Sequence, residues 1–167
     1  MGAEVHHKGR PSAKLQSRMF PEDVRVWTGP DVLLRLTLNA AQGMYWPERQ
    51  SNFCFCGESH RAAMLLTVLA YAYATGLADS QEIHRRFSTD CDLRYLCANN
   101  FPEWTTLRRF RRLHRPALQF VLTELLRQVW ITQPDVNIAD PALPDFALEA
   151  ATRINAAILA DASAIDE

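Results

Sequence analysis

The chain has 167 residues, a formal net charge of −1 and 48% hydrophobic residues, values of an ordinary single-domain globular protein. A chain of this length can bury a sizeable core, and its total charge predicts no polyanionic partner. The charge is unevenly distributed, however: residues 1–20 carry +3, residues 81–115 carry +4 and residues 131–167 carry −6. A strong local positive field is therefore expected in the middle of the chain.

Residues 1–20 lack the apolar segment of a secretory signal and are interrupted at Gly9 and Pro11. They predict a flexible basic arm, which either touches phosphates or is an unstructured leader; four basic residues favour the leader. The uncharged run from Ala62 to Ala78 is at the short limit for a membrane span, but its Thr and Tyr residues favour a core helix. We expect a cytoplasmic protein without membrane contact.

Asp31 opens the first predicted helix, which runs to about Met44. Residues 45–60 lack clean periodicity and predict a loop whose aromatic residues pack on the core or, as the less favoured alternative, stack on nucleic-acid bases. A helix that is apolar all round follows from Glu58 to Thr75, with Gly76 as its terminating residue. The aromatic residues of the loop are Tyr45, Trp46, Phe53 and Phe55.

Two short helices are predicted next, over 79–87 and 90–98, each beginning at a capping-box spacing. The first box is Asp79 with Glu82, and the second is Thr89 with Asp92. Asn99 and Asn100 end the second helix because asparagine tolerates the left-handed region. A basic helix then opens at Pro102.

At about 100° per residue, the basic helix presents an apolar stripe toward the core. Pro116 removes a backbone donor and predicts a kink or split near Arg112–Arg115, after which the helix continues to Trp130. A proline-containing linker (131–144) and a last helix from Phe146 to about Ala162, capped by Asp145, complete a compact all-α fold. The stripe consists of Leu107, Phe110, His114, Leu118, Val121 and Leu125.

Beside that stripe lies a cluster that we call the arginine ridge. Short helices followed by a basic helix predict a helix-turn-helix-like unit at about 79–115, with its last helix in the major groove of DNA. The guanidinium groups would contact phosphates or base edges, and Arg85 and Arg86 would hold the flanking backbone. The alternative is a solvated face that forms ion pairs with the acidic C-terminal segment. By helical spacing Arg108, Arg112 and Arg115 lie on one face beside the stripe, and the name also covers the intervening Arg109 and Arg111.

The chain shows no nucleophile–base constellation and no phosphate-binding glycine motif. Cys54, Cys56, Cys91 and Cys97, even with His60 or His84, lack the paired spacing of a zinc site, so reduced thiols are favoured, with Cys91 and Cys97 on apolar helix faces. Acids between Asp135 and Glu149 are read as linker residues and caps rather than metal ligands. His114 is read as a hydrogen-bonded core histidine. We expect no cofactor and no metal.

The segment from Met64 to His114 resembles the N-terminal domain of InsH-type transposases, from DDE insertion sequences. The resemblance rests on short sequence motifs that occur in the same order and spacing over about fifty residues. These motifs are Met64-Leu65-Leu66, Tyr71-Ala72-Tyr73-Ala74-Thr75-Gly76, Ser80-x-Glu82-Ile83, Leu93-Arg94-Tyr95-Leu96-Cys97, Pro102-Glu103-x-Thr105-Thr106-Leu107 and Phe110-Arg111-Arg112-x-His114.

The resemblance implies an all-helical domain that recognises the ends of a mobile element and helps transposase protomers associate. In such families an RNase H-like domain with three carboxylates and two magnesium ions performs the chemistry. The 37 residues after Trp130 are too few for that domain. We therefore expect a flexible arm (1–20), a transposase-like helical domain (21–130) and an acidic linker with a C-terminal helix (131–167), without catalytic activity.

The expected function is binding of double-stranded DNA at terminal inverted repeats, in association with the nucleoid. The chain would act as part of a split transposase, with a catalytic subunit or a second copy as partner, or as a remnant or regulator. The alternative is a helical dimerisation module without direct DNA contact. The residues expected to contact DNA are Arg85, Arg86, Arg108, Arg109, Arg111, Arg112 and Arg115.

Overall fold

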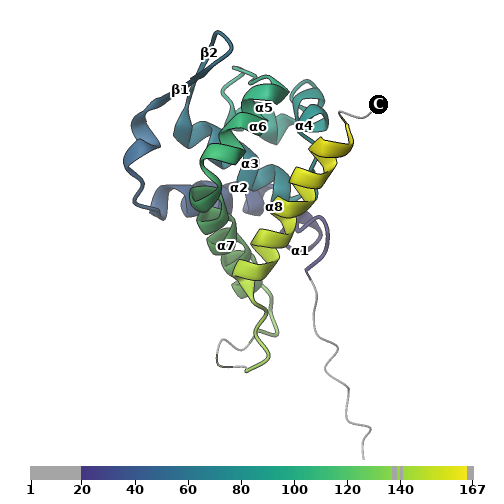
Figure 1. Cartoon of the computed structure of the whole chain (residues 1–167). Helices are drawn as coiled ribbons and strands as arrows, with labels where there is room; N and C mark the ends of the chain where they lie inside the picture. Colours follow the sequence, from purple (N-terminus) through teal and green to yellow (C-terminus); the bar gives the residue numbers. More distant parts are fainter. Residues whose placement is uncertain (1–19, 137–138, 140, 165–167) are drawn as a thin grey trace, which may run out of the picture.

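The computed structural model describes residues 20–136, 139 and 141–164. It shows a mostly helical body with a small hairpin (Figure 1), which confirms the predicted all-α class. Apart from Phe20, the predicted basic arm lies outside the described residues. The described helices are α1 (Arg25–Thr28), α2 (Pro30–Gly43), α3 (Ala62–Ala74), α4 (Ser80–Arg86), α5 (Cys91–Leu96), α6 (Trp104–Leu113), α7 (Arg115–Ile131) and α8 (Phe146–Ser163), with a 3₁₀ turn at Pro47–Gln50.

Helix α3 is the centre of the molecule. All its residues from Leu65 to Ala74 are buried, as its uninterrupted apolar sequence predicts, and it contacts α2, α5, α6, α7 and α8. Gly76 follows it with a φ of 79°. A side chain there would also collide with Glu22, because a Cβ would lie 2.6 Å from the Glu22 Cγ. Glycine is therefore required at the end of the helix.

The loop predicted for residues 45–60 was wrong in part. Asn52–Phe55 (β1) and Glu58–Arg61 (β2) form an antiparallel hairpin that projects from the body (Figure 1), and α3 begins at Ala62 rather than at Glu58. The turn uses Cys56 and Gly57, whose φ values are 48° and 82°. A two-residue turn with two positive φ angles matches the twist of the paired strands. The hairpin was missed because its four-residue strands give too short an alternation.

The short helices α4 and α5 form where the sequence predicts them. Asp79 accepts hydrogen bonds from the Gln81 and Glu82 amides, and so caps α4. The second cap is Asp90 rather than Thr89, because the Asp90 carboxylate accepts from the amides at 92 and 93. Asn99 ends this region with a φ of 59°, as expected.

The basic helix is split, as Pro116 predicts. Helix α6 ends at Leu113, His114 leaves helical geometry, and α7 starts at Arg115. The predicted stripe faces the core except at His114, which is half-buried. His114 packs against the rings of Trp46, Phe53 and Phe110, with centroids 4.6–5.9 Å away, rather than acting as a hydrogen-bonded core residue.

Helix α8 begins at the predicted cap, since Asp145 accepts from the Leu148 amide. It packs along α7 and also touches α3 and α4. Arg153 fixes it in place by donating to the backbone carbonyls of Pro21, Glu22, Tyr73 and Ala74 at 2.6–3.1 Å. The separation of residues 131–167 from the preceding domain stays a prediction, but α8 shares the core of the body.

The cysteines are free thiols. Cys97 is buried as expected and bonds to the Leu93 carbonyl, whereas Cys91 is exposed, which corrects its predicted place on an apolar face. Burial raises the pKa of the Cys97 thiol to about 11. Among the helices that the structure describes, none combines the length and the apolar character needed to cross a bilayer.

Candidate nucleic-acid interface

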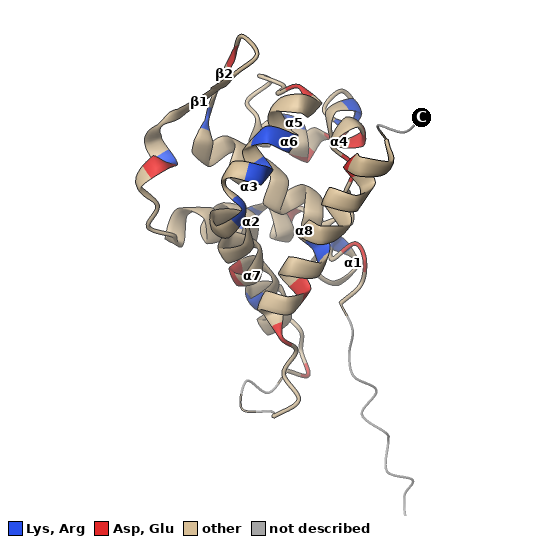
Figure 2. Ribbon diagram, viewed as in Figure 1, with Lys and Arg blue, Asp and Glu red and all other residues tan. Residues whose placement is uncertain are grey.

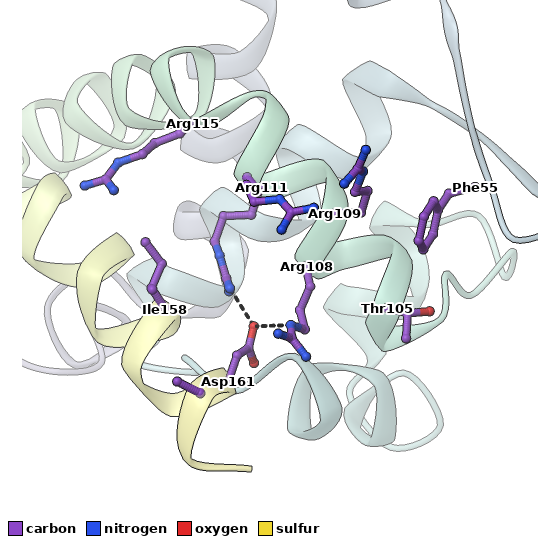
Figure 3. Close-up of a pocket in the computed structure, with 10 residues that line it drawn as sticks. Phe55, Thr105, Arg108, Arg109, Arg111, Arg115, Ile158 and Asp161 are labelled. Atoms are coloured by element: carbon purple, nitrogen blue, oxygen red, sulfur yellow. Dashed lines mark ion pairs between the residues drawn. The ribbon is translucent and has the colours of Figure 1, made fainter. Parts of the chain in front are cut away.

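The arginine ridge lies along an open groove of about 800 Å³. Helix α6 and the start of α7 carry the arginines, β1 contributes Phe55 on one side, and α8 contributes Ile158 and Ala162 on the other (Figure 3). Figure 2 shows basic residues on α6. The lining residues are Phe55, Thr105, Arg108, Arg109, Arg111, Arg112, Arg115, Ile158, Asp161 and Ala162.

At one end of the groove, Asp161 of α8 and Arg111 of α6 form a buried ion pair at 2.6 Å, with side chains 3% and 6% exposed. The Asp161 carboxylate also accepts from the Ser80 amide at 2.8 Å and the Ser80 hydroxyl at 2.7 Å. Arg111 further donates to the Tyr73 hydroxyl at 3.1 Å. Burial by itself lowers the pKa of Arg111, but Tyr73 and Asp161 hold that pKa above its ordinary value. The guanidinium therefore stays charged inside the fold.

The predicted contact of Arg111 with DNA stays a prediction, and this geometry does not favour it. The Arg111 side chain is directed to internal partners, and a phosphate could reach it only by displacing Asp161. Burial also raises the pKa of its partner Tyr73 to about 12, so this hydroxyl stays protonated. Arg111 thus ties α6 to α3 and α8 and positions the other arginines.

The remaining ridge arginines are more accessible. Arg108 is 32% exposed, and its Nε lies 3.8 Å from Asp161, a loose pairing. The Arg109 guanidinium lies over the Phe55 ring, 6.0 Å from the centroid. Arg112 is exposed and has no ion-pair or hydrogen-bond partner among the described residues. Arg115 donates to the Asn155 side chain at 2.7 Å.

Arg85 and Arg86 lie outside the groove, on the exposed face of α4. Both pair with Glu82, at 2.8 and 2.7 Å, and remain 64% and 54% exposed. The hydrogen bond from Arg86, together with Arg85, lowers the pKa of Glu82 below its ordinary value. Exposed pairs of this kind contribute little to stability and open readily. Their predicted contact with flanking DNA backbone stays a prediction.

In the described part of the acidic C-terminal segment, Asp161 is the acid that reaches the ridge. Asp145 instead caps its own helix, and Glu149 pairs with Arg153. Among the residues that the structure describes, five arginines thus line the groove against one carboxylate. This excess leaves a net positive concave surface, the electrostatic requirement of a phosphate-binding site.

Sequence reasoning missed Asp161 and the groove itself. A signal for Asp161 was present, because it continues the buried face of α8 formed by Ala150, Ile154 and Ala157 at helical spacing. An acid on a buried stripe needs a basic partner. Of the loop aromatics, Trp46 and Phe53 pack inward as favoured, but Phe55 lines the groove and Tyr45 is 92% exposed.

No cluster of three or more His, Cys, Asp or Glu side chains suited to a metal ion occurs within residues 20–136, 139 and 141–164. His84 and Glu103 approach each other at 3.8 Å, but without a third ligand. The described side chains of the groove are cationic, apolar or hydroxyl-bearing apart from Asp161. What they can do chemically is to bind anions.

In a comparison with known proteins, a family model matches part of the chain. Residues 50–113 match the family model described as "Transposase domain (DUF772)". The matched segment runs from the hairpin to the end of α6, and contains the arginines from 108 to 112 but not Arg115 or α8. No curated protein and no solved structure matches the chain. The match supports a transposase-related protein. It does not support the more specific prediction of an InsH-type N-terminal domain.

Proposed function

We propose that this chain is a transposase-derived DNA-binding domain that holds DNA phosphates in the groove along α6. The observation that carries the proposal is a set of accessible arginines that line one groove, with Asp161 as the one carboxylate among its described lining residues. These arginines are Arg108, Arg109, Arg112 and Arg115. Planar guanidinium groups suit bidentate contact with phosphate oxygens. The transposase-domain match over α6 supports the same function. The proposal assigns binding, and no chemical step, to these residues.

A salt titration tests this proposal. Fluorescence anisotropy of labelled DNA, measured between about 50 and 200 mM salt, gives the number of phosphates neutralised. The double variant Arg109→Ala/Arg112→Ala is expected to weaken binding and to reduce the salt slope by roughly 1.4–1.8, the value for two lost phosphate contacts. Arg35→Ala/Arg94→Ala removes the same charge from exposed positions outside the groove. Equal slopes for the two double variants would contradict the assignment.

A helical protein-interaction module is the second candidate. Helix α8 exposes Leu148 and Leu159 at 64% and 68%, and α7 exposes Phe120 at 57%. Exposed apolar residues on neighbouring helices can support self-association, which transposase protomers need. Sedimentation equilibrium tests this candidate by measuring whether the chain forms a dimer. If Leu148→Asp/Leu159→Asp abolishes the dimer and leaves the DNA affinity unchanged, these two residues serve association alone.

A further inference from the structure

The arginine face of α6 is flanked on both sides. The hairpin stands on one side through Phe55, and α8 stands on the other through Ile158 and Ala162 (Figure 3). A helix that reads a duplex projects its side chains into a major groove about 12 Å wide. The flanked face of α6 instead forms a concave site. Its volume of about 800 Å³ is in the range of sites for small molecules, the size of one or two nucleotides rather than of a duplex.

Phe55 supplies an aromatic surface in this groove. Residues 53 and 55 lie on the same face of β1, because side chains alternate along a strand. Phe53 packs against Phe110 at a centroid distance of 5.2 Å and anchors the strand on α6. Phe55, two residue pairs closer to the turn, is only partly buried, and the Arg109 guanidinium lies over its ring. A partly exposed aromatic ring beside arginines is the combination that single-strand binding sites use.

The hairpin is held in register with α6. The Glu58 carboxylate accepts hydrogen bonds from the Glu103 amide, at 3.2 Å, and from the Thr106 hydroxyl. Glu58 thereby caps the start of α6, which has no cap from its own residues. The opposite strand of the same hairpin carries Phe55, so its ring and the Arg109 guanidinium are positioned before any ligand binds.

Stacking on Phe55 requires a base whose face is free. In an intact duplex each base is covered by its neighbours, and an enzyme or binding protein reaches a base face only after unpairing or unstacking it. Resting on the proposed DNA-binding function, we propose that the groove binds an unpaired DNA nucleotide. Its base stacks on Phe55, and the adjoining phosphates lie on Arg109 and Arg112.

The test compares three labelled DNAs with the full chain: a blunt duplex, the same duplex with a short single-stranded extension, and the single strand alone. The wild type is expected to bind the extended duplex and the single strand more tightly than the blunt duplex. Phe55→Ala is expected to weaken binding to the two DNAs with unpaired bases by roughly 5- to 150-fold, the range for one lost base stack. Phe55→Trp retains an aromatic surface for stacking, so this variant should still bind the extended duplex and the single strand more tightly than the blunt duplex.

Two controls guard against loss of folding. Phe55→Leu keeps an apolar side chain on the strand but removes the aromatic face. This variant should no longer bind DNAs with unpaired bases more tightly than the blunt duplex, while its midpoint of thermal unfolding should equal that of the wild type. Tyr45→Ala removes an aromatic residue that is 92% exposed and outside the groove, and should bind as the wild type does. Quenching of 2-aminopurine placed in the extension reports stacking directly, and should disappear in Phe55→Leu.

The outcomes separate the two proposals. If Arg109→Ala/Arg112→Ala binds all three DNAs as the wild type does, the proposed function fails. If the arginine variant weakens all three while Phe55→Leu matches the wild type on each, DNA binding stands and stacking on Phe55 is overturned. Equal wild-type affinity for blunt and extended duplexes, without 2-aminopurine quenching, also overturns the inference.

Discussion

The substitution Asp161→Asn tests how the groove is built. It keeps the shape of the side chain but removes the charge opposite Arg111. The side chains of Asp161 and Arg111 are only 3% and 6% exposed, so neither group can exchange its partner for water. The oxygen of the new amide can still accept a hydrogen bond from Ser80. The NH₂ group of the amide replaces the second carboxylate oxygen, however, and there it would face another hydrogen-bond donor instead of accepting from it.

The expected loss is about 3–5 kcal/mol in the free energy of unfolding, because removing one member of a buried ion pair leaves an uncompensated charge. At about 2–4 °C per kcal/mol for a protein of this size, the midpoint of thermal unfolding should fall by roughly 6–20 °C. The double variant Arg111→Met/Asp161→Asn removes both charges, keeps an acceptor for the buried Ser80 donors and should regain part of the loss.

Urea unfolding followed by circular dichroism measures these differences. Asp31→Asn serves as the control, since Asp31 is exposed on the first turn of α2, and its change should stay within about 0.5 kcal/mol of the wild type. A loss below about 1 kcal/mol for Asp161→Asn, or a double variant less stable than both single variants, would refute the view that Asp161 neutralises Arg111.

Two further predictions concern α8 and His114. Arg153→Lys keeps the positive charge but not the planar fork that reaches carbonyls of two segments, so urea unfolding should show a loss of about 1–3 kcal/mol; wild-type stability would show that those contacts are dispensable. Burial lowers the pKa of His114 below its ordinary 6.5, so the unfolded chain binds the proton more tightly. The contribution of neutral His114 to the free energy of unfolding is therefore fully present above pH 6.5. It is lost as the pH falls from 6.5 through the pKa of His114 in the folded state, which is lower. His114→Phe should flatten the pH dependence of unfolding between pH 7.5 and 5, and an unchanged dependence would assign it to another group.

Local sequence signals placed most helices and their ends. Caps at Asp79 and Asp145, the left-handed Asn99 and the break before Pro116 each depend on interactions within a few residues, so the chain itself specifies them. The uninterrupted apolar run of α3 similarly specifies burial on all sides. Helical spacing alone also placed Arg108, Arg112 and Arg115 beside the apolar stripe.

Tertiary structure decided which arginines remain available. Arg111 and Arg112 are neighbours of one residue type, yet the first is buried against Asp161, fifty residues away, and the second is exposed. Phe53 and Phe55 likewise differ because one meets Phe110 and the other ends beside the groove. The sequence alone determined the helices and the clustering of positive charge, because both follow from short-range periodicity. The partners that neutralise or frame that charge come from distant segments, and only the packing of α8 and the hairpin against α6 brings them together.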